Sequence, residues 1–190
     1  MKSPVEVLGQ VAHLLDQLGI PYMIVGSIAS SLYGDARATA DVDIVVELQA
    51  EHIPQLHVAL EKDFYVDEQA MRRAVQSRRL FNAIHFDSLF KVAVYVARSD
   101  AFTQEQFTRR RQEKLLPDSE QTFALASPED TLLAKLRWHR QGGAVSARQI
   151  TDAAGILKVQ DERMDRTYLR EWADRLGVGD LLEQILNDAR

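Results

Sequence analysis

The chain has no cysteine among its 190 residues, which excludes a disulfide framework, a thiolate zinc site and a cysteine nucleophile. No apolar run approaches the roughly eighteen residues of a membrane-spanning helix, and the N-terminal Met-Lys-Ser-Pro-Val-Glu lacks the apolar segment of a signal peptide. Acidic residues outnumber basic ones by 28 to 23, and the net charge of −5 argues against nonspecific clamping of a long nucleic acid. We therefore expect a cytoplasmic protein without membrane contact.

What the chain does contain is ordinary for a globular protein. Hydrophobic residues make up 46% of it and charged residues 27%, and 190 residues fit one domain or a domain with a closely packed appendage. Apolar periodicity and turn residues predict strands at 22–25, 42–48, 64–66 and 122–125, and a hairpin of 79–86 with 89–97 around Asp87-Ser88. The same signals predict helices at 4–18, 28–33, 50–62, 67–75, 103–113, 127–141, 146–159, 165–176 and 180–189. The expected fold is α/β (α+β), with an α/β core over 1–101 and a mainly helical region over 102–190.

Two carboxylates open the second apolar strand. Asp41 and Asp43 are two residues apart, so on an extended chain they leave the same face, while Val42, Ile44 and Val46 leave the other and can enter a core. Adjacent carboxylates repel each other unless a cation lies between them. Mg²⁺ prefers such oxygen ligands and is usually held by one or two carboxylates together with substrate phosphates.

A Gly-Ser turn precedes this strand and supplies the other half of such a site. Gly26 allows the backbone to approach a ligand closely, and the N–H groups at the start of the helix that follows Gly26-Ser27 can bind phosphate. The alternative interpretation is the end of a surface hairpin with two solvated aspartates.

The arrangement of Gly26-Ser27, thirteen residues and then Asp41-Val-Asp43 between apolar strands resembles the signature of the nucleotidyltransferase superfamily related to DNA polymerase β. The stretch Arg37-Ala-Thr39-Ala-Asp41-Val-Asp43 is also similar to the form found in small bacterial nucleotidyltransferases of the abortive-infection toxin type. The resemblance implies a small mixed sheet with helices. It also implies transfer of a nucleoside monophosphate from a nucleoside triphosphate to an RNA (tRNA) or protein acceptor, and a possible antitoxin partner.

The resemblance also assigns roles to residues. Asp41 and Asp43 would hold Mg²⁺, while Gly26 and Ser27 would position the β- and γ-phosphates. Lys135 would contact the triphosphate or pyrophosphate, although its residue chemistry equally fits a solvated lysine on the outer helix face.

Two further residues have competing interpretations. Asp152 resembles a late acidic residue that supports the site in the toxin relatives, or it is a surface aspartate paired with Arg148 at i,i+4. Arg37 either reaches phosphate or the acceptor, or is a solvated loop arginine. A set of arginines forms an RNA-facing patch if its members converge: Arg72, Arg73, Arg78, Arg79 and Arg109 to Arg111.

The chain departs from the superfamily pattern at one position. The superfamily places a third carboxylate on a neighbouring strand, after a Lys-Val pair in relatives of this type, but here Lys91-Val92 is followed by Ala93. Strand alternation puts Ala93 on the site-facing side, and Asp87 in the hairpin turn is a distant substitute. The chain is therefore either a nucleotidyltransferase with a two-carboxylate site, a nucleotide- or partner-binding pseudoenzyme, or a structural domain that binds no nucleotide.

Overall fold

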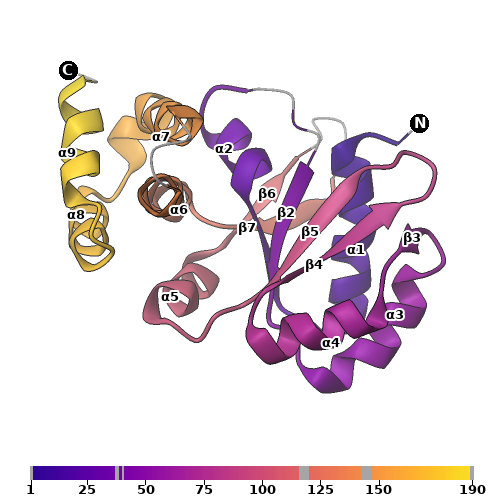
Figure 1. Ribbon diagram of the computed structural model, residues 1–190. Coiled ribbons are helices and arrows are strands. Elements are labelled where there is room, and N and C mark those ends of the chain that lie inside the picture. The colour runs from indigo at the N-terminus through magenta and orange to yellow at the C-terminus, as the bar shows by residue number, and fades with distance from the viewer. Residues whose placement is uncertain (1, 37–38, 40, 116–119, 143–146, 189–190) are drawn as a thin grey trace. The chain divides into compact units, whose positions relative to one another are not determined.

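The computed structural model describes residues 2–36, 39, 41–115, 120–142 and 147–188, and for Asp41 it describes the backbone only (Figure 1). The chain divides into two compact units, each with its own internal packing. The first comprises residues 1–27 and 38–125, and the second comprises residues 28–37 and 126–190. The boundary predicted near residue 101 falls inside the first unit.

The first unit is built on a mixed sheet, which has seven strands in the described residues, in the order β3-β4-β5-β2-β1-β7-β6. The strands are β1 (Tyr22–Val25), β2 (Asp41–Val46), β3 (Phe64–Tyr65), β4 (Leu80–His85), β5 (Lys91–Val96), β6 (Arg111–Lys114) and β7 (Thr122–Leu125). Strands β2 and β5 pair in parallel, while β4 and β5 form the antiparallel hairpin predicted around Asp87-Ser88. The predicted α/β class is confirmed.

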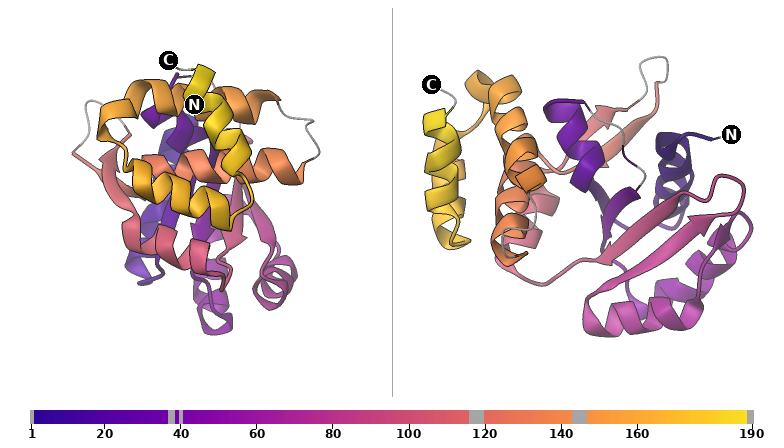
Figure 2. Two further views of the ribbon diagram at one scale, coloured as in Figure 1. Left: turned by 90° about the vertical axis from the view of Figure 1, so that its left-hand side faces the viewer. Right: turned by 45° about the horizontal axis from the view of Figure 1, so that its top comes forward.

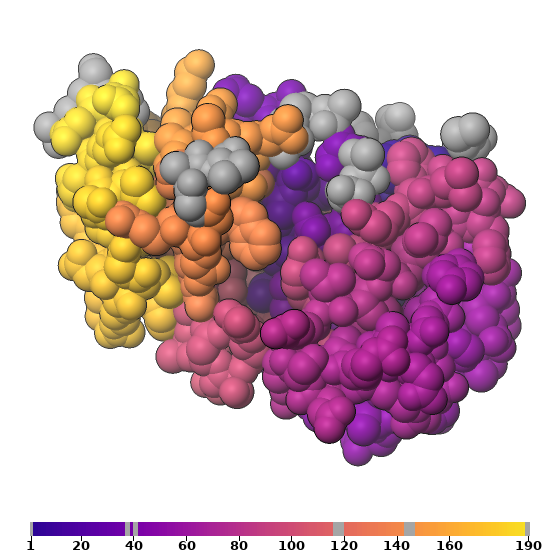
Figure 3. Space-filling model, viewed as in Figure 1, coloured from indigo at the N-terminus to yellow at the C-terminus, as the bar shows by residue number. Residues whose placement is uncertain are grey.

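Helices α1 (Pro4–Gln17), α3 (Ile53–Leu60) and α4 (Glu68–Ser77) cover one face of this sheet (Figure 2). In the space-filling view, the segment from α3 to β4 forms much of the outer surface of the first unit (Figure 3). The covered face receives the apolar side chains of β2 and β5, which are all buried: Val42, Ile44, Val46, Val92, Val94 and Val96. Because strand side chains alternate, residues 41, 43, 91, 93 and 95 belong to the opposite face.

Helix starts follow the local sequence. Ser3 forms a capping box with Glu6 at the start of α1, and Asp67 caps α4 by accepting from the Ala70 backbone N–H. Ser127 caps α6 (Pro128–Gln141), with Pro128 in the first turn. The helices predicted over 4–18, 67–75 and 127–141 therefore begin within one residue of the predicted positions.

The end of the predicted helix over 103–113 is wrong. Helix α5 covers Ala101–Arg109, after which the chain extends into β6 and pairs with β7. The pairing of Arg111 with Leu125 and of Lys114 with Thr122 provides hydrogen-bond partners for the edge of β7, which a longer helix would leave unpaired.

The second unit consists of α2 (Gly26–Tyr33) from Ile28 onward, α6, α7 (Ala147–Gln160), α8 (Arg166–Arg175) and α9 (Gly179–Asp188) (Figure 2). Leu132, Leu133 and Leu136 form the buried stripe of α6, whereas Trp138 is 57% exposed. Within the described ranges, no helix has the length and apolar character needed to cross a membrane.

Candidate functional site

Asp43 lies beside the Gly-Ser turn. Strands β1 and β2 pair antiparallel, with Val25 opposite Asp43, so the residue that precedes Gly26 and the second aspartate occupy the same register position. A Cβ atom added to Gly26 would lie 2.9 Å from both Cβ and Cγ of Asp43. The absence of a side chain at Gly26 is therefore what makes room for the Asp43 carboxylate.

The backbone of Gly26 has φ of +66°, a left-handed conformation that favours glycine. This conformation turns the chain from β1 directly into α2, which begins at Gly26, two residues earlier than predicted. The positive end of the α2 dipole therefore lies at the Gly26-Ser27 turn, next to a carboxylate. Backbone N–H groups at such a helix start are suited to phosphate oxygens.

Strand β5 lies alongside the two aspartates. In the parallel register Asp41 is opposite Lys91, and Asp43 is opposite Ala93. Residues opposite each other on neighbouring strands share a face, so Ala93 belongs to the face of Asp43, as the sequence predicts. The Ala93 methyl group is buried, and Asn82 of β4 is its partner on the other side.

The donor set at this point fits a hard divalent cation that is completed by a substrate. Positions 41 and 43 of β2 are both aspartates, and carboxylate oxygen is the ligand type that Mg²⁺ prefers. Among the described residues, however, no group of three or more carboxylate or imidazole side chains gathers for a metal. Any ion held here would take further oxygen ligands from water or a phosphate chain.

Lys135 and Asp152 come together within the second unit. Lys135 Nζ lies 2.7 Å from Asp152 Oδ2, joining α6 to α7, and the two side chains are only 7% and 9% exposed. The interpretation of Lys135 as a solvated surface lysine is therefore wrong. Asp152 is not a solvated surface aspartate either, because its carboxylate forms an ion pair with this buried lysine.

Sequence reasoning missed a buried acidic cluster at the start of α6. Asp130 accepts hydrogen bonds from the Tyr168 hydroxyl at 2.6 Å and from Ser127 Oγ at 2.8 Å, and it is fully buried. Glu129, also buried, accepts from the Asp165 backbone N–H at 3.1 Å. These acids tie α8 to α6. The sequence shows Ser-Pro-Glu-Asp only as a helix start, since the tyrosine lies 38 residues away.

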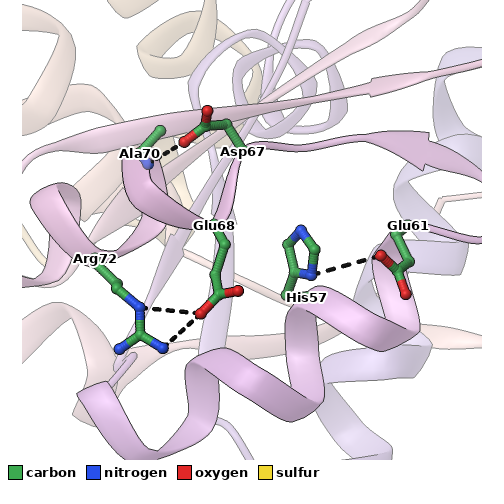
Figure 4. Close-up of polar contacts among 6 residues, drawn as sticks. All are labelled: His57, Glu61, Asp67, Glu68, Ala70 and Arg72. Atoms are coloured by element: carbon green, nitrogen blue, oxygen red, sulfur yellow. Dashed lines mark hydrogen bonds and ion pairs between the residues drawn. The ribbon is translucent and has the colours of Figure 1, made fainter.

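Three of the arginines proposed as an RNA-facing patch have other contacts. Arg72 pairs with Glu68 one turn earlier on α4 (Figure 4), and Arg78 donates to the Ala97 carbonyl oxygen at 3.0 Å. Arg110 lies over the Phe107 ring at 5.5 Å. Intrahelical pairs of this kind are typical of solvated helix surfaces. Arg37, the remaining predicted phosphate ligand, lies outside the described residues.

The fold is that of known nucleotidyltransferases. An antigenic nucleotidyltransferase-like protein from Paracoccidioides brasiliensis is similar with a TM-score of 0.57 and 21% identity, covering 95% of this chain and 90% of that one. The antibiotic-resistance factor ANT(2'')-Ia gives a TM-score of 0.56 at 10% identity, covering 95% of this chain and 96% of that one. The lincomycin-bound lincosamide antibiotic adenylyltransferase LnuA gives 0.53 at 13% identity, covering 83% and 98%.

No protein-family model and no curated protein sequence matches the chain. The structural likeness defines the class: the chain has the nucleotidyltransferase superfamily fold, as its Gly-Ser and Asp-Val-Asp segments predict.

Proposed function

We propose that the protein transfers a nucleoside monophosphate from a nucleoside triphosphate to a hydroxyl group, in a Mg²⁺-dependent reaction. The observation that carries this proposal is the packing of Asp43 against Gly26. It sets a carboxylate next to a helix start that suits phosphate, in a chain with the nucleotidyltransferase fold. Asp43 and the Gly26-Ser27 turn therefore have adjacent positions in the first unit.

In this proposal, the aspartates of β2 and the turn that begins α2 have separate roles. Asp41 and Asp43 would hold the divalent cation. When bound, this cation would neutralise part of the charge of the triphosphate and activate the attacking hydroxyl group. Ser27 and the first backbone N–H groups of α2 orient the terminal phosphates. Most of the rate increase then comes from positioning and electrostatic stabilisation, because the protein forms no covalent bond to the nucleotide.

Lys135 is assigned to the triphosphate or the departing pyrophosphate, with Asp152 holding its ammonium group in place. The ion pair of 2.7 Å supports this assignment because it fixes one orientation of a long side chain. Both residues belong to the second unit. Arg37 keeps its proposed role at phosphate or acceptor.

Two similarities bear on the chemical class of the acceptor, and they favour different answers. The Arg37–Asp43 segment resembles toxin-type enzymes, which favours an RNA or protein acceptor, an antitoxin partner and a cytoplasmic location. The antibiotic adenylyltransferases of the same fold favour a small hydroxylated molecule, since ANT(2'')-Ia has been solved with adenylyl-2''-tobramycin. We favour the RNA or protein acceptor, because the toxin-type motif lies in the chain itself.

A second candidate function is a nucleotide-binding pseudoenzyme. It is favoured by the register that sets Ala93 opposite Asp43, where the superfamily carries its third carboxylate. A metal ion at two carboxylates would still bind with the nucleotide. The ion that acts on the attacking hydroxyl would lack one ligand.

Incubation with Mg²⁺, labelled nucleoside triphosphates and either total RNA or tobramycin tests both candidates. The wild type is compared with Ala93→Asp and with Asp43→Asn as the inactive control. Label transferred by the wild type and lost in Asp43→Asn supports the enzyme, and the labelled acceptor identifies its class. Transfer only by Ala93→Asp supports the pseudoenzyme, while equal behaviour of the wild type and Asp43→Asn in transfer and nucleotide binding contradicts both.

A further inference from the structure

Lys91 places a positive charge on the face of the sheet that carries the two aspartates. It is the first residue of β5 and lies directly opposite Asp41 in the parallel register, while Asp43 is one step along the diagonal. Neighbouring strands are about 4.8 Å apart, which a four-carbon lysine stem spans easily. The side chain is partly buried, so its charge is less screened than that of a fully exposed lysine.

The neighbours of Lys91 in the register on this face of β4 and β5 are uncharged, and they include the polar Asn82 of β4. Ile84 of β4 is its register partner on the side away from β2, and Ala93 follows two residues later on the same face of β5. Leu89, two residues earlier, is 75% exposed at the hairpin turn. The acidic positions next to Lys91 in the register are therefore those of β2, and the ammonium group is attracted toward them.

We infer that Lys91 is the built-in counter-ion of the aspartate pair, which it neutralises when no metal is bound. The inference rests on the proposed function, because it concerns the same two carboxylates. It explains how adjacent carboxylates are tolerated on β2 without a metal and with alanine at position 93. A lysine in this place also competes with a divalent cation for the same oxygens.

A bound triphosphate changes what Lys91 does. With metal and triphosphate both bound, the aspartates would hold the metal, and the Lys91 ammonium group would then be available to the anionic phosphate chain. Lys91 therefore opposes binding of metal alone but favours binding of metal with triphosphate. A merely structural lysine would not produce two effects of opposite sign.

The test measures both affinities in the variant Lys91→Met. Mn²⁺ binding without nucleotide is followed by electron paramagnetic resonance, and binding of inorganic tripolyphosphate with Mg²⁺ by calorimetry, which removes any dependence on the base. The matched control is Lys114→Met on β6, which removes the same charge from an exposed ion pair with Glu120 in the same unit. Lys91→Arg keeps the charge, and Lys91→Gln serves if the methionine variant fails to fold.

We expect Lys91→Met to bind Mn²⁺ about three- to tenfold more tightly and Mg²⁺-tripolyphosphate about three- to tenfold more weakly. Lys91→Arg should restore both affinities toward the wild type, and Lys114→Met should change neither. Affinities of Lys91→Met that equal those of the wild type, or that change in the same direction, overturn the role of Lys91 while the proposed function stands. A wild type that binds neither probe, or an Asp43→Asn variant that binds both unchanged, contradicts the proposed function itself.

Discussion

The Asp43 side chain occupies the space that any side chain at Gly26 would need. The hypothetical Cβ of residue 26 lies 2.9 Å from Asp43 Cγ, closer than real Cβ contacts come. The turn that starts α2 and the strand that carries the aspartates therefore constrain each other. The consequence is that the phosphate-binding and metal-binding halves of the proposed site are joined by one glycine.

Gly26→Ala should therefore destabilise the protein and weaken triphosphate binding together. The left-handed φ of +66° costs alanine about 1 kcal/mol, and the collision with Asp43 adds about 1–3 kcal/mol. Chemical denaturation measures the free energy of unfolding, and calorimetry with Mg²⁺-ATP measures the affinity.

Gly19→Ala is the matched control. Gly19 has φ of +65°, but nothing lies within 4 Å of its added Cβ, so it reports the backbone strain alone. The difference between the two variants isolates the contact with Asp43. Equal losses of stability in both variants would contradict this account of Gly26.

The buried ion pair between Lys135 and Asp152 predicts a non-additive pair of substitutions. Lys135→Met removes the cation from a carboxylate that is 9% exposed, which should lower the free energy of unfolding by about 3–5 kcal/mol. Adding Asp152→Leu should recover much of that loss, because the double variant buries neither charge of this pair. Urea denaturation of the wild type, both single variants and the double variant gives the coupling energy.

The double variant also separates structure from function. If Lys135 contacts the triphosphate, the folded double variant should still lose Mg²⁺-ATP affinity. A stable double variant that binds Mg²⁺-ATP like the wild type would restrict the pair to a structural role.

The strands and the Gly-Ser and Asp-Val-Asp segments could be predicted because their signals are local. Alternating apolar residues mark β2 and β5, and the spacing from Gly26 to Asp43 predicts the nucleotidyltransferase fold without any distant contact. The face on which Ala93 lies followed from the same alternation, whereas its position opposite Asp43 became known only from the pairing of β2 with β5. Local periodicity was sufficient wherever one face of a strand is buried in the core.

The features that could not be predicted depend on distant partners. Arg111–Lys114 forms a strand because β7 is available to pair with it, although the preceding residues continue a helical pattern. The burial of Lys135 depends on Asp152, seventeen residues later, and that of Asp130 depends on Tyr168. Single-sequence patterns carry no information on such pairings between elements.

The hydrogen bond from Tyr168 to Asp130 should contribute to stability but not to catalysis. Tyr168→Phe removes the hydroxyl donor 2.6 Å from a fully buried carboxylate, which should cost about 1–3 kcal/mol. Tyr65→Phe, on a ring that is 63% exposed, should change the free energy of unfolding by less than about 0.5 kcal/mol. Thermal and urea denaturation compare the two variants. A similar loss in both would show that the bond to Asp130 is not the cause.

The raised pKa of Tyr22 predicts that the free energy of unfolding decreases at alkaline pH. Burial, together with the nearby Asp16 carboxylate, raises the pKa of the Tyr22 phenol from 10.0 to about 12. Between these two values the unfolded chain has lost the phenol proton while the native protein still holds it, so rising pH favours unfolding. The stabilisation is complete below pH 10 and is lost as the pH passes through about 12. Relative to Tyr22→Phe, the wild type should lose about 1–2 kcal/mol over this range, measured by urea denaturation at stepwise pH. A constant difference between wild type and variant from pH 9 to about 12 would contradict the raised pKa.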